Sequence, residues 1–183
     1  MNPDFISTTE LNAEGFTLKI LPPTFKLAVE VFNIFDSDRE KMTFFLPDGV
    51  FESIEETYMH YKKRTITPNR KMFQIFQDDE LLGEIGFSMI NPRIGKVEIA
   101  FWIKKSARGN GIINKLLPHI EKMAFDCDWC HKIQIHCDTE NTASRKIAEK
   151  NGYKLEGIIR QDSKWPNGSL RDKCYFGKLK SDI

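Results

Sequence analysis

The fold of this chain is decided by the stretch Arg108-Gly109-Asn110-Gly111-Ile112-Ile113. An apolar run from Val97 to Ile103 precedes it and is typical of a strand, and a segment with the apolar spacing of a helix follows it. A glycine-rich turn that leads into a helix leaves backbone N–H groups without intrahelical partners, and such groups bind phosphate. The stretch lacks the Gly-Lys-Ser/Thr of a Walker loop and the spacing of the dinucleotide motif. It therefore predicts a loop that holds a diphosphate, with an ordinary glycine turn as the alternative.

Strand and helix patterns alternate along the rest of the chain. We expect strands at 16–20, 72–76, 81–90, 97–103 and 133–137, helices around 27–35, 53–61, 113–124 and 143–150, and a final hairpin that turns at Asn167-Gly168. The segment from Thr43 to Asp48 is expected to lack regular structure because it contains a proline. This alternation predicts a mixed α/β sheet covered by helices, with the phosphate loop at the carboxyl end of a strand, where ligands bind in such sheets.

Composition limits the classes of protein to be considered. A chain of 183 residues is expected to form one domain that spans residues 1–183. The balance of 27 Lys and Arg against 26 Asp and Glu gives no reason to expect a nucleic acid or an acidic membrane as partner, although two local basic clusters, 62–64 and 104–108, keep a nucleic-acid-binding domain as an alternative. No leader-like segment and no apolar run of about 20 residues is visible, so we expect a soluble cytoplasmic protein.

The four cysteines raise a separate question. Cys127-Asp128-Trp129-Cys130-His131 matches the C-x-x-C-H string of haem attachment, and His136 and Cys137 lie close enough in sequence to be candidate metal ligands. No export signal accompanies the haem string, and a zinc site would need a second Cys or His pair. We therefore expect reduced thiols and no metal.

Three ordered motifs resemble those of the GNAT superfamily of acetyl-CoA-dependent N-acetyltransferases. Arg108, Gly111 and Ile113 occupy the defined positions of Arg-x-x-Gly-x-(Gly/Ala), the pyrophosphate motif of that family, with Ile113 in place of a small residue. The stretch 141–157 is similar to its Asn-x-x-Ser…Glu-Lys-x-Gly-Phe/Tyr-x-x-Glu-Gly signature. The stretch 165–168, followed by Asp172, resembles the closing hairpin of the RimJ/RimL branch, which acetylates ribosomal proteins.

The resemblance covers about residues 72–179 and implies a fold, a cosubstrate and a binding site. The fold is a mixed, mostly antiparallel twisted sheet of about seven strands flanked by about four helices. The cosubstrate is acetyl-CoA, which would be held by the main chain of the strand, by the glycine loop and by an asparagine. The residues that the resemblance assigns to it are Trp102, Ile103, Arg108, Gly109, Asn110, Gly111, Ile112, Ile113 and Asn141.

Two residues are candidates for the chemistry of acetyl transfer, in which an amine loses a proton and a thiolate gains one. Glu98 lies in an otherwise apolar strand, where burial would raise the pKa of its carboxyl towards that of a useful base. The alternative is a solvated glutamate on an edge strand. Many GNAT enzymes have a tyrosine as thiol acid, but the matching position here is Ala148. Ser144 is then the nearest hydroxyl for that role, unless it only bonds the first turn of its helix.

The acceptor is the least determined part of the sequence. In the GNAT fold the segment between the first two helices and the last hairpin frame the acceptor, so Phe44, Phe45 and Trp165 are the candidate substrate-binding residues. We expect an α-amine of a protein N-terminus or of an aminoacyl compound, attacked directly on the thioester. A small-molecule amine such as a polyamine or aminoglycoside, or a CoA-binding module without catalysis, stays open, as does the choice between a monomer and a homodimer.

Overall fold

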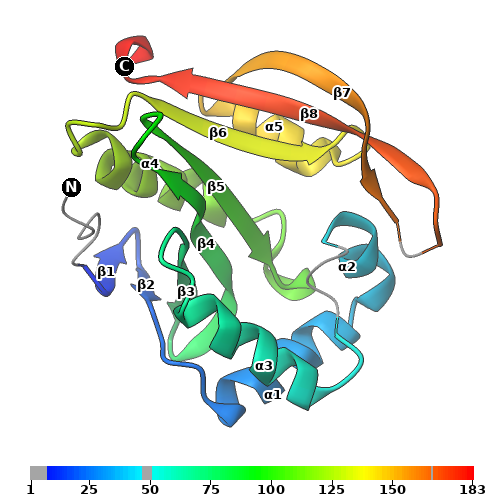
Figure 1. Cartoon of the computed structure of the whole chain (residues 1–183). Coiled ribbons are helices and arrows are strands. Elements are labelled where there is room, and N and C mark those ends of the chain that lie inside the picture. Colours follow the sequence, from blue (N-terminus) through cyan, green and yellow to red (C-terminus); the bar gives the residue numbers. More distant parts are fainter. Residues whose placement is uncertain (1–7, 47–50, 166) are drawn as a thin grey trace.

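The computed structural model describes residues 8–46, 51–165 and 167–183, which form one twisted sheet with helices on both faces (Figure 1). The strands are β1 Glu10–Ala13, β2 Phe16–Lys19, β3 Lys71–Gln77, β4 Glu80–Asn91, β5 Lys96–Ile103, β6 Lys132–Asp138, β7 Lys154–Lys164 and β8 Leu170–Leu179. The α-helices are α1 Phe25–Asp36, α2 Arg39–Phe45, α3 Ile54–Thr65, α4 Ile112–Phe125 and α5 Thr142–Lys150, and short 3-10 turns follow at η2 Lys105–Ala107 and η3 Lys180–Asp182.

The sheet has the strand order β1-β2-β3-β4-β5-β6-β8-β7 and is antiparallel except where β5 meets β6. These two parallel strands pair only from Lys96 with Lys132 to Glu98 with Gln134, although both continue further. Beyond Glu98 they separate, and Figure 1 shows β5 turning away from β6. The edge of β5 from Ile99 onward is therefore not paired with β6, and its backbone groups on that side can bond other partners, as the carbonyl of Ile103 does with Arg108.

The expected mixed, mostly antiparallel α/β architecture is confirmed, with one more strand and one more α-helix than the rough count from sequence. The additional strand is β1, a four-residue strand with no clear pattern of its own that pairs with β2. The additional helix is α2, so the expectation that Thr43 to Phe45 lacks regular structure was wrong. A proline breaks a helix only from its own position onward, and Leu46 ends α2 just before Pro47, which lies outside the described residues.

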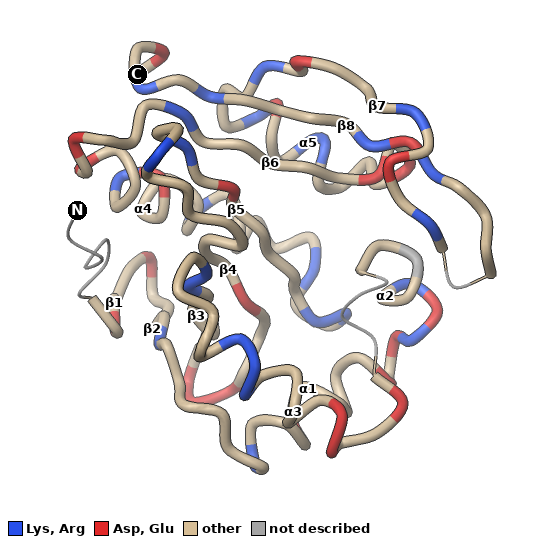
Figure 2. Tube along the Cα trace, viewed as in Figure 1, with Lys and Arg blue, Asp and Glu red and all other residues tan. Residues whose placement is uncertain are grey.

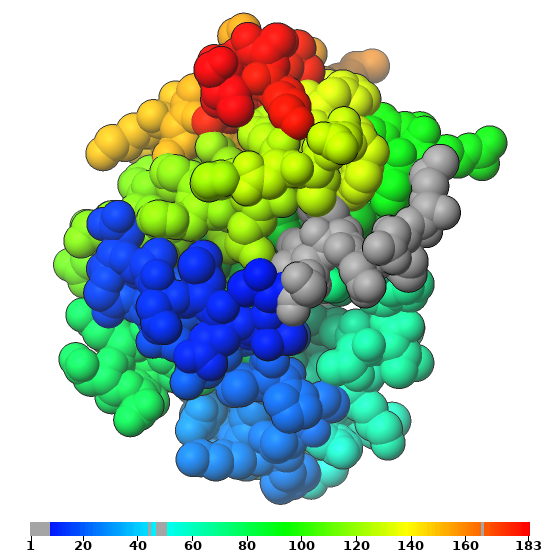
Figure 3. Space-filling view, turned by 90° about the vertical axis from the view of Figure 1, so that its left-hand side faces the viewer, coloured from blue at the N-terminus to red at the C-terminus, as the bar shows by residue number. Residues whose placement is uncertain are grey.

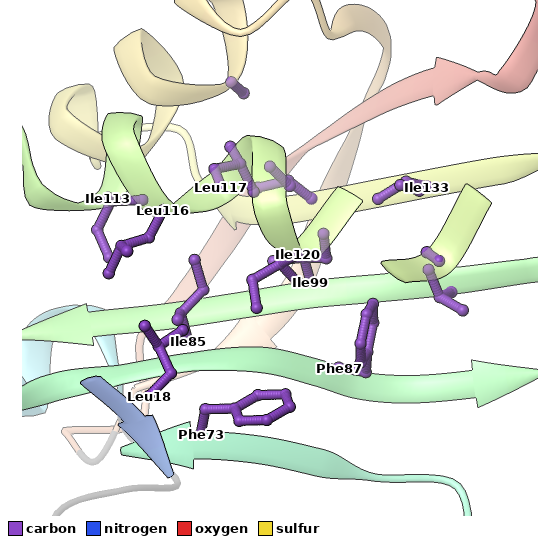
Figure 4. Packing of buried hydrophobic residues seen from close by; sticks show 14 of the residues in the cluster. Leu18, Phe73, Ile85, Phe87, Ile99, Ile113, Leu116, Leu117, Ile120 and Ile133 are labelled. Atoms are coloured by element: carbon purple, nitrogen blue, oxygen red, sulfur yellow. The ribbon is translucent and has the colours of Figure 1, made fainter. Parts of the chain in front are cut away.

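One face of the sheet is covered by α4 and α5. The apolar stripe expected in α4 is confirmed, because Ile113, Leu116, Leu117, Ile120 and Ala124 are all buried. They pack against alternate residues of the central strands, and Figure 4 shows this layer from close by, with the helix residues facing Leu18, Phe73, Ile85, Phe87, Ile99 and Ile133. Burial of this kind is the main source of stability for a sheet of limited size.

The other face is covered only in part. The second apolar cluster joins α1, α2 and α3 to β4 and β5, and its buried members are Leu27, Val31, Phe35, Met42, Tyr61, Leu81 and Trp102. Among the described residues no helix packs on this face of β6, β8 and β7, and α5 lies on the opposite side (Figure 1). Residues of β6 and β8 that alternate with the core positions therefore point to an uncovered face of the sheet.

The outer surface gives two further observations. Figure 3 shows the β1–β2 hairpin lying against α4, where Glu14 is 3.5 Å from His119. Figure 2 shows lysine and arginine dispersed along the trace together with acidic residues, in keeping with the net charge of +1. In the described part of the chain, no helix has the length and apolar character needed to cross a membrane.

Candidate active site

The glycine loop between β5 and α4 has the open backbone that a diphosphate requires. Gly109 has φ 82° and Gly111, the N-cap of α4, has φ 72°, which is a conformation that glycine adopts without strain. A Cβ built on either glycine meets nothing within 4 Å, so the space in front of the loop is free of protein atoms. Gly111 offers no side chain to cap the helix, so the N–H groups of the first turn of α4 remain available to an anion. The loop therefore fits a diphosphate.

Arg108 is directed into the protein in this structure. Its Nε donates to the carbonyl oxygen of Ile103 at 3.0 Å, and its Nη1 lies 2.5 Å from Oδ2 of Asp38, the N-cap residue of α2. Its Nη2 also lies 3.6 Å from the Sδ of Met42 in the same helix. The guanidinium thus connects the loop with α2, and this contact between distant parts of the chain could not be read from the sequence.

Trp102 and Ile103, the expected main-chain ligands of the cofactor, lie on the part of β5 that β6 does not pair. The side chain of Trp102 is buried and packs edge-on against Phe35, with ring centroids 5.0 Å apart. Its indole nitrogen donates to Oε2 of Glu84 at 2.9 Å. The side chain therefore has a structural role, and the role of the backbone as a cofactor ligand stays a prediction.

Glu84 is a buried carboxylate, 1% exposed, that ties α3 to the sheet beneath Trp102. It accepts two hydrogen bonds from the guanidinium of Arg64, at 3.1 and 3.2 Å, and one from the amide of Gln74 at 2.7 Å. Burial alone would raise the pKa of Glu84, but Arg64 and the hydrogen bonds hold it below its ordinary value. Sequence reasoning missed this cluster, although a lone glutamate within the apolar run 81–87 was a signal for it.

Glu98 lies where β5 and β6 begin to separate, and both of its carboxylate oxygens have partners. The hydroxyl of Ser88 donates to Oε1 at 2.9 Å, and Nδ1 of His136 lies 3.3 Å from Oε2. Ser88 is the extra residue of a β-bulge in β4, because Phe87 pairs with Ile99 and Met89 with Glu98. The bulge thus places the serine beside the carboxylate.

His136 is the residue of this cluster that sequence reasoning did not assign, since it was considered only as a metal ligand. Its ring contacts that of Tyr175, with centroids 3.9 Å apart, and the phenol of Tyr175 donates to Oδ2 of Asp162 at 2.5 Å. Burial lowers the pKa of His136, while Glu98 acts in the opposite direction. Burial and the bond to Asp162 raise the pKa of Tyr175 to about 12. The imidazole is therefore neutral at pH 7 and next to a carboxylate.

The helix α5 is held at its start by Asn141, whose side-chain oxygen accepts from the backbone N–H of Ser144 at 3.1 Å. This cap occupies the oxygen of the asparagine, which was expected to bind the cofactor. Ser144 is half-buried in the first turn, and Ala148 is completely buried one turn later, where a thiol-acid tyrosine is common in the family. The roles of Asn141 and Ser144 towards a ligand stay predictions.

The residues expected to frame the acceptor lie on two elements. Trp165 precedes the turn between β7 and β8, and its ring is covered by the guanidinium of Arg171 at 3.8 Å. Arg171 in turn lies 2.5 Å from Asp138 at the end of β6. Phe45 is half-buried at the end of α2, and the side chain of Phe44 lies outside the described part of the structure. Figure 1 draws α2 and the tip of the β7–β8 hairpin on the same side of the molecule.

The cysteines were considered as metal ligands, and all four are in the reduced state. Cys130, Cys137 and Cys174 are buried, and burial raises the pKa of Cys137 to about 12. Within the described ranges, no group of three or more His, Cys, Asp or Glu side chains is arranged to hold a metal ion.

Comparison with known proteins identifies the class to which this fold and glycine loop belong. Residues 17–154 match the family described as the acetyltransferase (GNAT) domain, and the chain belongs to this family. The resemblance read from the sequence motifs is thereby confirmed.

Individual relatives lie in the ribosomal-protein branch. The chain is 36% identical over 109 residues to the ribosomal-protein-serine acetyltransferase of Escherichia coli, a match that spans 60% of each protein. It is 26% identical over 178 residues to the putative ribosomal N-acetyltransferase YdaF of Bacillus subtilis, covering 92% of this chain and 93% of that protein. The solved structure of RimL, a ribosomal α-N-protein acetyltransferase in complex with coenzyme A, superposes with a TM-score of 0.82 at 22% identity, over 93% of this chain and 97% of that one.

Proposed function

We propose that this protein transfers the acetyl group of acetyl-CoA to an α-amine of a protein N-terminus or of an aminoacyl compound. The observation that carries the proposal is the position of two features along β5. The glycine loop lies at one end of the edge that β6 leaves unpaired, and the cluster of Glu98 and His136 lies at the other. The five residues of β5 that follow Glu98, from Ile99 to Ile103, span about 16 Å of extended backbone. An elongated ligand with a diphosphate at one end can lie along this edge with its reactive end beside the cluster.

Each part of the cofactor then has a partner of suitable chemistry. The first-turn N–H groups of α4 and the N–H groups of Gly109 and Gly111 bind the diphosphate. The backbone at Trp102 and Ile103, which β6 does not pair, binds the amide groups of the extended arm, as a neighbouring strand would, and the carbonyl of Ile103 exchanges Arg108 for the ligand. Ser144, in the first turn of α5, protonates the departing thiolate. The amine attacks the thioester carbon directly, so the protein supplies orientation and proton transfer while acetyl-CoA supplies the activated acyl group.

The acidity of amines favours an α-amine as the acceptor. An α-amine has a pKa of about 7.7–8.0, against about 10.4 for a lysine side chain, so it gives up its proton more readily at neutral pH. The cluster at the start of the unpaired edge of β5 contains an imidazole whose pKa is lowered by burial, which makes it a weak base. The relatives named above act, by their descriptions, on ribosomal proteins, one of them on serine and one on an α-amine.

The cofactor assignment is tested by thermal unfolding with and without coenzyme A. At about 100 times its dissociation constant, a ligand stabilises a protein by about 2.7 kcal/mol, which is about 5–11 °C in melting temperature for a chain of this length. Gly111→Val should abolish this increase, because its side chain fills the space in front of the loop. Gly15→Val is the matched control, since Gly15 also has a positive φ and open space but lies in the β1–β2 turn. Absence of any shift in the wild-type protein would contradict the assignment.

The acceptor assignment is tested by measuring coenzyme A release with a panel of amines. Peptides that begin with Ser, Ala or Met should be acetylated, and the same peptides with a blocked N-terminus and a free lysine should not. Mass spectrometry locates the acetyl group. If only polyamines or aminoglycosides are acetylated, the protein is an acetyltransferase, but the assignment of an α-amine as its acceptor is wrong. Binding of acetyl-CoA without turnover of any amine would support the CoA-binding module instead.

A further inference from the structure

We propose that His136 is the base that removes the proton of the acceptor amine, and that Glu98 is the positioning residue that orients it. This inference rests on the function proposed above, and it differs from the sequence reading, in which Glu98 itself was the base. The geometry of three residues on three adjacent strands leads to it: Ser88 on β4, Glu98 on β5 and His136 on β6.

The hydrogen bonds around Glu98 determine which nitrogen of His136 can act. Ser88 donates to Oε1, so the remaining oxygen, Oε2, faces Nδ1 of His136 at 3.3 Å. A carboxylate oxygen only accepts, so Nδ1 must carry a proton and donate it. In the neutral imidazole the lone pair is then on Nε2. The pair has the same arrangement as other His–carboxylate pairs in which the carboxylate fixes the tautomer of the base.

The Nε2 atom of His136 is buried and has no hydrogen-bond partner among the residues that the structure describes. The same holds for Oε1 of Gln134, two residues earlier on the same face of β6 and opposite Glu98 in the sheet. Both are acceptor atoms, and they lie where β5 and β6 separate. Buried acceptors are rarely left unpaired, and an ordered water is the usual partner. A water bound at Nε2 would satisfy this atom and would link the imidazole to an amine held beyond the last residue pair of β5 and β6.

The proton transfer balances without any further reactant. The ammonium group of the acceptor gives one proton through this water to Nε2, which forms an imidazolium whose charge is opposed by Glu98. The free amine attacks the thioester carbon and the C–S bond breaks. The thiolate takes a proton from the hydroxyl of Ser144, which takes the second proton of the nitrogen in return. The products are an N-acetyl amide, coenzyme A as a thiol and one proton, which His136 releases to solvent.

The charges around the imidazole fix the direction of the pH dependence. Burial lowers the pKa of His136, Glu98 raises it, and more distant charges add smaller effects of both signs. The other groups that face the ring are Lys173 and Lys96, which lower the pKa, Asp162, which raises it, and the neutral phenol of Tyr175. The acid limb of the rate profile should therefore lie below pH 6.5, the ordinary value for histidine. Removing the charge of Glu98 should lower the pKa of His136 further and so shift the acid limb to a lower pH.

The test compares two variants in the peptide assay across pH. His136→Gln should lower kcat by at least about 100-fold and remove the acid limb, with the KM for acetyl-CoA within a factor of two. Glu98→Gln should lower kcat less and keep the limb at a lower pH. In His136→Ala, added imidazole should restore part of the rate, which a purely structural histidine would not allow. His119→Gln is the control, because His119 is half-exposed on α4 and also pairs with a glutamate.

The opposite pattern would overturn the inference: an acid limb that survives in His136→Gln and disappears in Glu98→Gln makes Glu98 the base. Unchanged rates in both variants would exclude both roles. If the wild-type protein acetylates no amine, the proposed function fails, and nitrogen NMR of the imidazole still tests the geometry. The spectrum should show the proton on Nδ1 and a pKa below 6.5, with circular dichroism confirming that each variant is folded. A proton on Nε2 would refute the orientation argued here.

Discussion

The buried carboxylate of Glu84 allows a stability prediction worked from its contacts. Arg64 supplies two of the hydrogen bonds to this carboxylate and its main opposing charge, and its guanidinium also covers the ring of Tyr61 at 4.6 Å. In Arg64→Met the side chain keeps much of its apolar contact but loses the charge. Removing one partner of a buried ion pair costs about 3–5 kcal/mol, because the other charge remains buried. For a chain of this length that is about 6–20 °C in melting temperature.

The assay is thermal unfolding followed by circular dichroism at pH 7. Lys62→Met is the matched control, since Lys62 is exposed on the same helix and should change the melting temperature little. The double variant Arg64→Met/Glu84→Gln should melt above Arg64→Met, because the uncompensated charge is gone. A melting temperature of Arg64→Met within 2 °C of the wild type, or a double variant less stable than the single one, would refute the reasoning.

The pH adds a second test of the same carboxylate. The pKa of Glu84 is lowered in the folded protein, so its contribution to stability is complete above the unfolded value of about 4.3 and is lost as the pH falls through the lower folded value. Three further variants should respond as follows. Gly83→Ala should destabilise the protein by at least about 1–3 kcal/mol in urea unfolding, because its Cβ would lie 2.1 Å from the carbonyl oxygen of Trp102, whereas Gly157→Ala has open space and should not. Burial and nearby arginines lower the pKa of His60 to about 4, whereas the unfolded chain binds this proton near pH 6.5. The free energy of unfolding should therefore fall as the pH is lowered from 6.5 to 4. In His60→Gln this decrease should be smaller. Trp165→Ala should raise the KM for a peptide acceptor and leave the KM for acetyl-CoA unchanged in steady-state kinetics, and the reverse result would place the acceptor elsewhere.

The parts of the fold that depend on local patterns were predictable from the sequence. The loop at Gly111, the apolar stripe of α4, the hairpin of β3 and β4 and the turn at Gly152 each rest on residues that are close in the chain. Helix α2 was missed because Pro47 was taken to exclude regular structure from all six residues between Thr43 and Asp48, although a proline does not prevent a helix that ends before it. Strand β1 was missed because it owes its structure to pairing with β2 rather than to a pattern of its own.

The candidate site was predictable only as a list of residues, because its geometry depends on pairings across the sheet. Glu98 was identified by its place in an apolar strand, but its partner His136 is 38 positions away and becomes a neighbour only through the short parallel pairing of β5 with β6. A β-bulge brings Ser88 to the carboxylate of Glu98, and the residue types around Ser88 do not predict a bulge. The cofactor and acceptor roles of the remaining residues rest on family resemblance and await the experiments above.

The contact of Arg108 with Asp38 has a thermodynamic consequence. One guanidinium contacts both the loop before α4 and the start of α2, and it is the closer of two cations near Asp38, since Nζ of Lys105 lies 4.0 Å from that carboxylate. Any ligand that draws Arg108 towards a phosphate must weaken its pairing with Asp38, and by linkage the two effects are equal in free energy. Asp38→Asn should then raise the affinity for coenzyme A while loosening α2. Binding of the cofactor at the loop and the stability of α2 are thus coupled through one side chain.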